Sequence, residues 1–277
     1  MTTASSGTRG SELARRSASG LALATIVLAS TATVPTFTAV LLAVTLGSLW
    51  ELAGMTARKG EPLAFLVAAL AITVYLLFAA FGLQHVYEKT ILAATVIASL
   101  GFTLVGDRSN YFARSAFTLF GALYVGWLGS YFLALRNLPH VGVQYTVASI
   151  VVIACTDIFA MFVGSTLGRT PMTSISPRKT WEGAAGGFAA SVAAGATMGL
   201  LPFMLLPWWD GAIVGAVTSV AAQAGDIVES ALKRDARVKD AGTIMAGHGG
   251  ILDRFDSYIF GGIAFYGALF VTGHIPH

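Results

Sequence analysis

The sequence predicts an all-α polytopic integral membrane protein with about nine transmembrane helices. Hydrophobic residues make up 55% of the 277 residues, charged residues only 11%, and the mean hydropathy is +0.73. Soluble domains carry about 25% charged residues, so this chain has too few charges to cover a water-facing surface. The apolar runs are long and continuous, without the alternation over about ten residues that is typical of membrane β-strands.

Nine apolar segments are each close to the roughly 20 residues that span a bilayer. They are residues 18–34, 36–54, 62–82, 89–105, 114–135, 143–165, 183–206, 209–225 and 257–274. Residues 1–17 are rich in Ser, Thr and Ala, which predicts a disordered cytoplasmic tail. Residues 9–34 also fit a signal peptide, but the eight spans that follow favour a retained first helix. Residues 18–277 are therefore expected to form a single membrane-embedded catalytic domain, with its main site at 226–256.

The distribution of Lys and Arg predicts the orientation. With the N-terminus cytoplasmic, fifteen of the seventeen basic residues fall in cytoplasmic segments, leaving only Lys89 and Arg136 outside. This places the C-terminus outside and both polar loops on the cytoplasmic side of the cytoplasmic membrane. An eight-span variant would move the N-terminal arginines outside. Because the basic residues lie in short loops, the pI of about 9.1 indicates membrane topology rather than nucleic-acid binding.

A few isolated residues have specific readings. The single cysteine, Cys155, excludes an intramolecular disulfide and gives no support to a Cys-based zinc site. Glu51 follows Trp50 near a helix end and is expected at the membrane interface, and Gln223 is expected to bridge helices. Asp157 lies inside an apolar run, where a carboxylate is costly and is a functional-site hypothesis by default. The alternative for Asp157 is a hydrogen-bonding residue between helices.

A charged cluster follows the eighth apolar segment. If residues 225–240 form a helix leaving the membrane, one stripe contains Asp226, Ser230, Lys233, Arg237 and Asp240, with Arg234 at its border. A carboxylate followed by cations suits a site for a metal and phosphates. The alternative is a solvated helix end whose cations only set topology.

A glycine-rich segment, residues 242–250, comes next. Its backbone can approach a ligand closely, and successive N–H groups can cradle phosphate oxygens. Asp253 and Asp256 follow, and with Asp226 they offer the hard oxygens that Mg²⁺ binds together with substrate phosphates. A local ion pair with Arg254 is the alternative for the aspartates, but it leaves the glycines unexplained. A nucleoside triphosphate with its magnesium accounts for both features, and His248 is expected to contact phosphate or fix the loop.

A second polar cluster is SISPRKTWEG, residues 174–183, on the predicted cytoplasmic side. Arg178 and Lys179 supply charge that pairs with phosphate, and the helix expected to start at Thr180 offers an N-terminus that favours anions. The alternative is a structural loop and helix cap.

These motifs resemble a known family. The run Ser230-x-Leu232-Lys233-Arg234-x4-Lys239-Asp240-x-Gly242, followed by His248-Gly249-Gly250-x-x-Asp253-Arg254-x-Asp256, resembles the signature of phosphatidate cytidylyltransferases, or CDP-diacylglycerol synthases. SPRKTWEG is similar to that family's Ser-Pro-Lys-Lys-Thr-Trp-Glu-Gly element, and WELAG (50–54) extends the similarity. The sequence departs from the family at Met245 and Ala246, and after Asp157, where the family tends to show Asp-Thr-Gly-Ala-Tyr.

The resemblance implies a reaction of CTP with phosphatidic acid that gives CDP-diacylglycerol and pyrophosphate and requires Mg²⁺. It implies metal ligands at Asp226, Asp253 and Asp256. The charged catalytic residues would be Asp226, Lys233, Arg234, Lys239, Asp253 and Arg254. The substrate-binding residues would be Ser176, Arg178, Lys179, Ser230, His248, Gly249, Gly250 and Asp157. Membrane lipids and a second copy of the chain are the expected partners, and nucleic acid is not.

Three other classes compete with this reading. A transporter of a small anionic or lipid substrate explains Asp157 and the spans, but not a glycine-rich loop between carboxylates. A CDP-alcohol phosphotransferase would carry an Asp-Gly-x-x-Ala-Arg…Gly…Asp…Asp pattern, which is absent. A purely structural membrane protein has no need of the charged cluster.

Overall fold

The computed structural model describes residues 20, 23–104, 110–242 and 249–275, and within these ranges the regular structure is helical. Residues 23–30 are helical and precede α2 (Val34–Arg58), α3 (Phe65–Ala80), α4 (Gln84–Thr103), α5 (Tyr111–Gly121), the π-helix η1 (Ala122–Trp127), α6 (Leu128–Arg136), α7 (Gly142–Leu167), α8 (Trp181–Gly199), the 3-10 helix η2 (Pro202–Met204), α9 (Trp208–Asp235) and α10 (Leu252–Val271). Each predicted apolar segment overlaps at least one of these helices, and the segment 114–135 overlaps α5, η1 and α6, which run on from one another. His248 and residues 1–17 lie outside the described ranges.

Among the described residues, four helices are long and apolar enough to cross a membrane: α2, the continuous helix Tyr111–Arg136, α7 and α9. Helix α3 is equally apolar but shorter, with 16 residues. Length and composition therefore support a helical membrane protein, whereas the count of nine spans stays a prediction.

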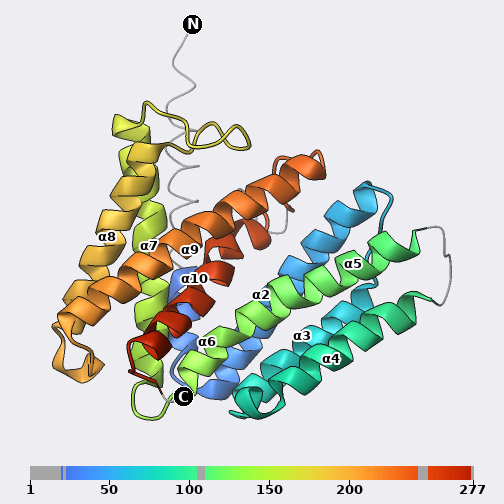
Figure 1. Cartoon of the computed structure of the whole chain (residues 1–277), viewed down its shortest axis with the longest axis horizontal. Coiled ribbons are helices and arrows are strands. Elements are labelled where there is room, and N and C mark those ends of the chain that lie inside the picture. Colours follow the sequence, from blue (N-terminus) through green and yellow to red (C-terminus); the bar gives the residue numbers. More distant parts are fainter. Residues whose placement is uncertain (1–19, 21–22, 105–109, 243–248, 276–277) are drawn as a thin grey trace, which may run out of the picture.

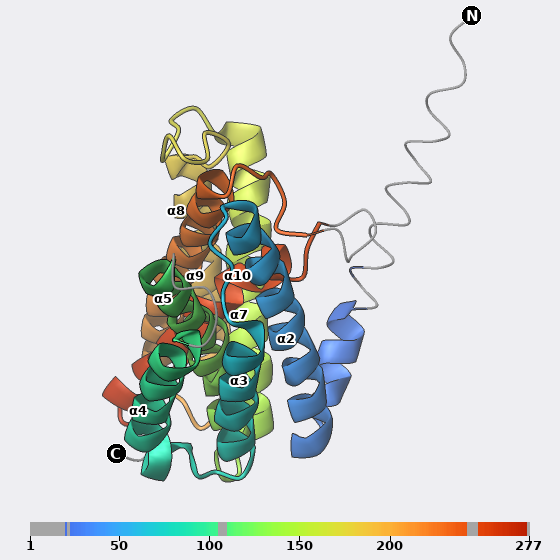
Figure 2. The same cartoon turned by 90° about the vertical axis from the view of Figure 1, so that its right-hand side faces the viewer.

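The helices form a bundle in which α10 is central. Figure 1 shows α7 and α8 on one side, α3 and α4 on the other, and α9 and α10 between them. Helix α9 packs against both α8 and α10, and α8 packs against α7. In the turned view of Figure 2, α3 runs beside both α2 and α4. The main core includes Leu49, Ile72, Val125 and Ile259, none of them exposed.

Close helix packing on the α7–α8–α9 side depends on glycines. A Cβ on Gly187 would lie 2.6 Å from the carbonyl oxygen of Thr156, and one on Gly183 would lie 2.7 Å from that of Ala160. Gly195 of α8 and Gly211 of α9 face each other in the same way. Small residues let helix backbones approach closely in membrane proteins. Within the described chain, these glycines serve contacts inside one subunit.

The two ends of the bundle are linked differently. At one end, Lys59 pairs with Asp235 at 2.5 Å, and the Asn110 side chain donates to the carbonyl of Gly60 at 3.0 Å. At the other end, Arg136 donates to the carbonyls of Thr31 and Ala32, and Asn137 donates to those of Ala79 and Ala80. The first end, which we call the charged end, carries the connections that the sequence predicts to be cytoplasmic.

The end of α9 corrects one expectation. The helical stripe predicted from the sequence runs to residue 240, but α9 ends at Asp235, and Arg237 has a left-handed φ of 56°. The N–H of Val238 bonds to the carbonyl of Lys233 at 2.9 Å, and the N–H of Arg237 bonds to that of Arg234 at 3.0 Å. These two bonds form a Schellman motif, which satisfies the last carbonyls of a helix and stops it. Arg237 and Asp240 therefore do not share the helical stripe of Asp226.

Candidate active site

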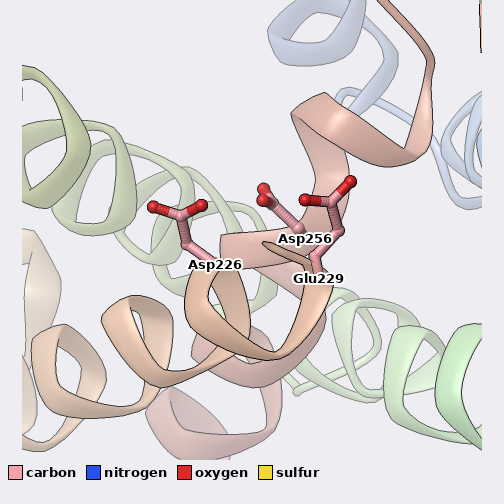
Figure 3. A group of neighbouring side chains, drawn as sticks. All are labelled: Asp226, Glu229 and Asp256. Carbon is pink, nitrogen blue, oxygen red and sulfur yellow. The ribbon is translucent and has the colours of Figure 1, made fainter. Parts of the chain in front are cut away.

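Three carboxylates meet where α9 and α10 cross. Asp226, Glu229 and Asp256 each offer an oxygen, and these oxygens all lie within 4.8 Å of one another. Figure 3 shows the side chains of α9 and α10 turned toward the same space. Gly225 permits this approach, because a Cβ there would lie 2.7 Å from the carbonyl oxygen of Asp256. We call these three residues the acidic centre.

Glu229 is the most buried member of the acidic centre. It is 0% exposed, and neither of its carboxylate oxygens has a hydrogen-bond partner. The ammonium of Lys233 lies 2.5 Å from Oε2, an ion-pair distance without the directionality of a hydrogen bond. Lys233 offsets the charge at Oε2, but Oε1 has no hydrogen-bond partner, and buried polar groups are nearly always hydrogen-bonded, which indicates that a further cation or donor belongs there. Glu229 is not among the site residues predicted from the sequence, although its place one turn after Asp226 was a signal.

Two lysines from separate segments reach this region. Lys179 Nζ lies 2.8 Å from Oδ1 of Asp226 and 3.2 Å from the hydroxyl of Ser230. Lys233 Nζ donates to Oδ1 of Asp253 at 2.7 Å. The two polar clusters read separately from the sequence thus form one site at the charged end of the bundle.

The segment that carries Lys179 is held by α8. Thr180 is the N-cap, with its hydroxyl accepting from the N–H of Gly183 at 3.1 Å. Glu182, which precedes the apolar stretch 183–206, accepts from the N–H groups of Arg169 and Thr170 and from the Thr170 hydroxyl. Bonds from its own N–H and from these groups lower the pKa of the Glu182 carboxyl to about 2. Ser176 and Arg178 lie in the segment so fixed, with Arg178 exposed.

Asp253 lies beside the acidic centre and organises the glycine-rich segment. Its Oδ2 accepts from the N–H of Gly250 at 2.7 Å and from that of Ala241 at 3.0 Å, while Oδ1 faces Lys233. The N–H of Gly250 is thus donated inside the protein, rather than being free to cradle a phosphate. Gly249 has φ of 83°, a left-handed conformation that glycine adopts without strain. Arg254 follows on the first turn of α10, with its side chain exposed.

Glu51 makes a contact that the sequence did not predict. Its side chain is buried, at 3% exposed, and accepts from the N–H of Ile251 at 3.0 Å and from that of Leu252 at 2.8 Å. These N–H groups begin α10, where the first N–H groups of a helix lack partners within the helix. The partners are about 200 residues apart in sequence, and no local pattern marks this contact.

Asp157 links helices. Its Oδ1 accepts from the hydroxyl of Ser257 at 3.1 Å, which joins α7 to α10 one residue after Asp256. This contact corresponds to the hydrogen-bonding alternative, at a position bordering the acidic centre. The prediction for Gln223 is confirmed, since its amide donates to the carbonyl of Ala184 on α8 at 3.3 Å.

Two pockets flank the end of α9. A polar pocket of about 290 Å³ is lined by Arg58, Arg237 and Lys239 together with residues 238 and 240–242. An apolar pocket of about 240 Å³ lies between α2, α5 and α9, with the Lys59–Asp235 pair among its lining residues. Lys239 is therefore placed in a basic pocket beside the segment that Asp253 holds.

Comparison with known proteins identifies the family. Residues 14–272 match the model of the cytidylyltransferase family. The chain is 36% identical over 228 residues to a phosphatidate cytidylyltransferase of Bacillus subtilis, covering 81% of this chain and 85% of the relative. It is 35% identical over 216 residues to one of Staphylococcus epidermidis, covering 77% and 82%. Phosphatidate cytidylyltransferase 4, chloroplastic, of Arabidopsis thaliana is 38% identical over 190 residues, covering 59% of this chain and 48% of the relative. The chain belongs to the cytidylyltransferase family.

Proposed function

We propose that this protein is a phosphatidate cytidylyltransferase, which transfers CMP from CTP to phosphatidic acid and releases pyrophosphate. The main observation behind this proposal is a set of ion pairs. Lys179 and Lys233, which come from separate segments, both pair with carboxylates of α9 and α10. Such a site offers both signs of charge to a metal-bound triphosphate and a lipid phosphate. The family membership and the relatives' names support the same activity.

The acidic centre fits a divalent cation. Its donors are hard carboxylate oxygens, and those of Glu229 lack hydrogen-bond partners. Mg²⁺ is usually held by one or two carboxylates together with phosphates and water. Asp226, Glu229 and Asp256 would hold the ion, and Asp253 would join them on exchanging its bonds to Lys233 and the backbone. When bound, Mg²⁺ supplies charge neutralisation and polarises phosphoryl oxygens.

The chain's own residues would align two anionic substrates. A phosphatidate oxygen attacks the α-phosphorus of CTP, the bond from that phosphorus to the bridging oxygen breaks, and pyrophosphate leaves with the electron pair. The attacking phosphate is already ionised, so no general base is needed. The task is to hold the phosphates in line and offset their repulsion. Lys179, Lys233 and Arg234 would pair with them near α9. The remaining proposed contacts with the substrates are made by Ser176, Arg178, Lys239, Arg254, His248 and Gly249.

We also propose the membrane arrangement. The nine apolar segments cross the cytoplasmic membrane with the N-terminus inside, and residues 1–17 form a disordered cytoplasmic tail ahead of the single catalytic domain, 18–277. The charged end then faces the cytoplasm, where soluble CTP can reach it, and acyl chains enter between helices from the bilayer. Exposed apolar side chains on α7, among them Ile158, Met161 and Phe162, suit contact with lipid. A homodimer is the proposed assembly.

Labelled CTP tests the activity. Purified protein in detergent, given phosphatidate, Mg²⁺ and CTP labelled in the cytidine, should release pyrophosphate and transfer the label to lipid in equal amounts. Reactions without phosphatidate serve as the control and should release neither product. Absence of pyrophosphate at saturating phosphatidate would contradict the proposal.

A further inference from the structure

Glu51 is a buried carboxylate that the proposed reaction does not use. It belongs to α2, yet its two oxygens accept the N–H groups of Ile251 and Leu252, where α10 begins. The exposed fraction of Glu51 is 3%. Two N–H donors at a helix N-terminus stabilise a carboxylate through hydrogen bonds and through the helix dipole. Helix α2 therefore holds the start of the helix that carries Asp253 and Asp256.

The glycines at the two ends of the glycine-rich segment, Gly242 and Gly250, also lie against Glu51. A Cβ added to Gly242 would lie 2.5 Å from the Glu51 carboxyl carbon, and one on Gly250 would lie 2.7 Å from the same atom. Neither glycine has a positive φ, unlike Gly249 between them. Space for Glu51, rather than backbone conformation, therefore requires glycine at 242 and 250. One side chain thus contacts both the first and the last residue of the glycine-rich segment.

The contact continues to the charged residues of the site. Asp253 accepts the N–H groups of Ala241 and Gly250. Ala241 precedes Gly242, and Gly250 precedes Ile251, so both donors lie next to residues that meet Glu51. Asp253 in turn pairs with Lys233, and Lys233 lies against Glu229. A shift of the segment relative to α2 would therefore move Asp253 and its lysine partner.

We infer that Glu51 is a positioning residue for the nucleotide, which clamps residues 242 and 250–252 so that Asp253 and Lys233 keep the arrangement that binds the metal-bound triphosphate. This inference rests on the proposed cytidylyltransferase function. It assigns α2 a part in positioning the residues that bind CTP.

Steady-state kinetics separate this role from a merely structural one. Glu51→Ala should raise the KM for CTP about tenfold or more, because two charge-assisted hydrogen bonds are lost, while the KM for phosphatidate rises clearly less. Glu51→Gln should recover part of the loss, since its amide oxygen accepts one N–H. Gly54→Ala is the matched control on α2, because nothing lies within 4 Å of the added Cβ. Equal changes in both KM values, or in neither, would overturn the inference.

A double-mutant cycle tests the clamp without relying on activity. Gly250→Ala should lower the thermal unfolding temperature in detergent, because its Cβ displaces the Glu51 carboxylate. In a Glu51→Asp background, whose shorter side chain leaves room, Gly250→Ala should cost clearly less. Strictly additive effects would mean that Glu51 and Gly250 do not interact, which contradicts the clamp. A wild-type protein that released no pyrophosphate would instead contradict the proposed function and leave this cycle informative.

Discussion

At the scale of single residues, the carboxylates of the site differ from one another in how exposed they are and in which groups they pair with. The side chain of Asp226 is 40% exposed and pairs with Lys179, whereas that of Glu229 has no exposure. Asp253 is 10% exposed and accepts from a lysine and two backbone N–H groups. Asp253 therefore has the most partners of these three carboxylates, whereas Glu229 has the ammonium of Lys233 and no hydrogen bond.

Glu229→Gln tests the metal role of the acidic centre. The amide keeps the volume of the side chain but removes the charge, so the Mg²⁺ concentration for half-maximal rate should rise about tenfold to a hundredfold. The thermal unfolding temperature should change little, because Gln keeps the volume of the side chain and Lys233 keeps its ion pair with Asp253. Titrating the rate with Mg²⁺ and recording unfolding in detergent measures both effects. An unchanged Mg²⁺ dependence would exclude Glu229 as a ligand.

Asp253→Asn should abolish turnover while the protein remains folded and membrane-inserted. Asparagine offers one oxygen to the three donors that Asp253 now satisfies, namely Lys233 and the N–H groups of Ala241 and Gly250. The residual rate and its Mg²⁺ dependence distinguish two roles. A shift in half-saturation as large as that of Glu229→Gln assigns Asp253 to the metal, and a loss at every Mg²⁺ concentration assigns it to positioning.

The matched control for both variants is Asp235→Asn. Asp235 is also on α9, but its side chain is 61% exposed and pairs with Lys59. Exposed ion pairs contribute only about 0–1 kcal/mol, so the rate and the Mg²⁺ dependence should stay close to those of the wild type. Near-normal turnover in Asp253→Asn as well would remove Asp253 from both roles.

At the scale of helices, the sequence predicts where apolar segments lie better than where helices end. Apolar length places α7 and α9 correctly, because a long apolar run has few other structures available in a bilayer. The end of α9 depends on the left-handed backbone of Arg237, and an arginine in the sequence does not predict a left-handed conformation. The charged stripe was therefore extended one turn too far.

Gly187→Leu tests the packing of α8 on α7. The side chain must displace the backbone near Thr156, so the thermal unfolding temperature in detergent should fall by about 5 °C or more. Gly101→Leu on α4 is the control, because a Cβ there meets nothing within 4 Å. Equal unfolding temperatures for the two variants would contradict close α7–α8 packing within one chain.

At the scale of the whole molecule, the sequence predicted many of the residues of the site but not the contacts between those that lie far apart in the chain. Residues close in sequence, such as Asp226, Ser230 and Lys233, could be grouped by helical spacing. The contact of Lys179 with Asp226 and that of Glu51 with α10 depend on how distant helices pack. No rule based on sequence spacing predicts such contacts, and so the contact of Glu51 with α10 was not predicted.

Matched cysteine substitutions test the proposed orientation. In a Cys155→Ala background, Pro139→Cys should react with a membrane-impermeant maleimide on intact cells, and Pro62→Cys only after permeabilisation. Both prolines are exposed, between α6 and α7 and between α2 and α3 respectively. The unsubstituted background should not be labelled. Reaction of Pro62→Cys on intact cells would reverse the orientation.

The different links at the two ends of the bundle have a consequence for its response to ionic strength. At the charged end, partly exposed ion pairs join Lys59 to Asp235 and Lys179 to Asp226. At the opposite end, Arg136 and Asn137 bond to main-chain carbonyls, which carry no net charge. Added salt screens exposed ion pairs far more than it weakens bonds to neutral acceptors. Raising the salt concentration therefore loosens the helices around the site while their opposite ends stay joined.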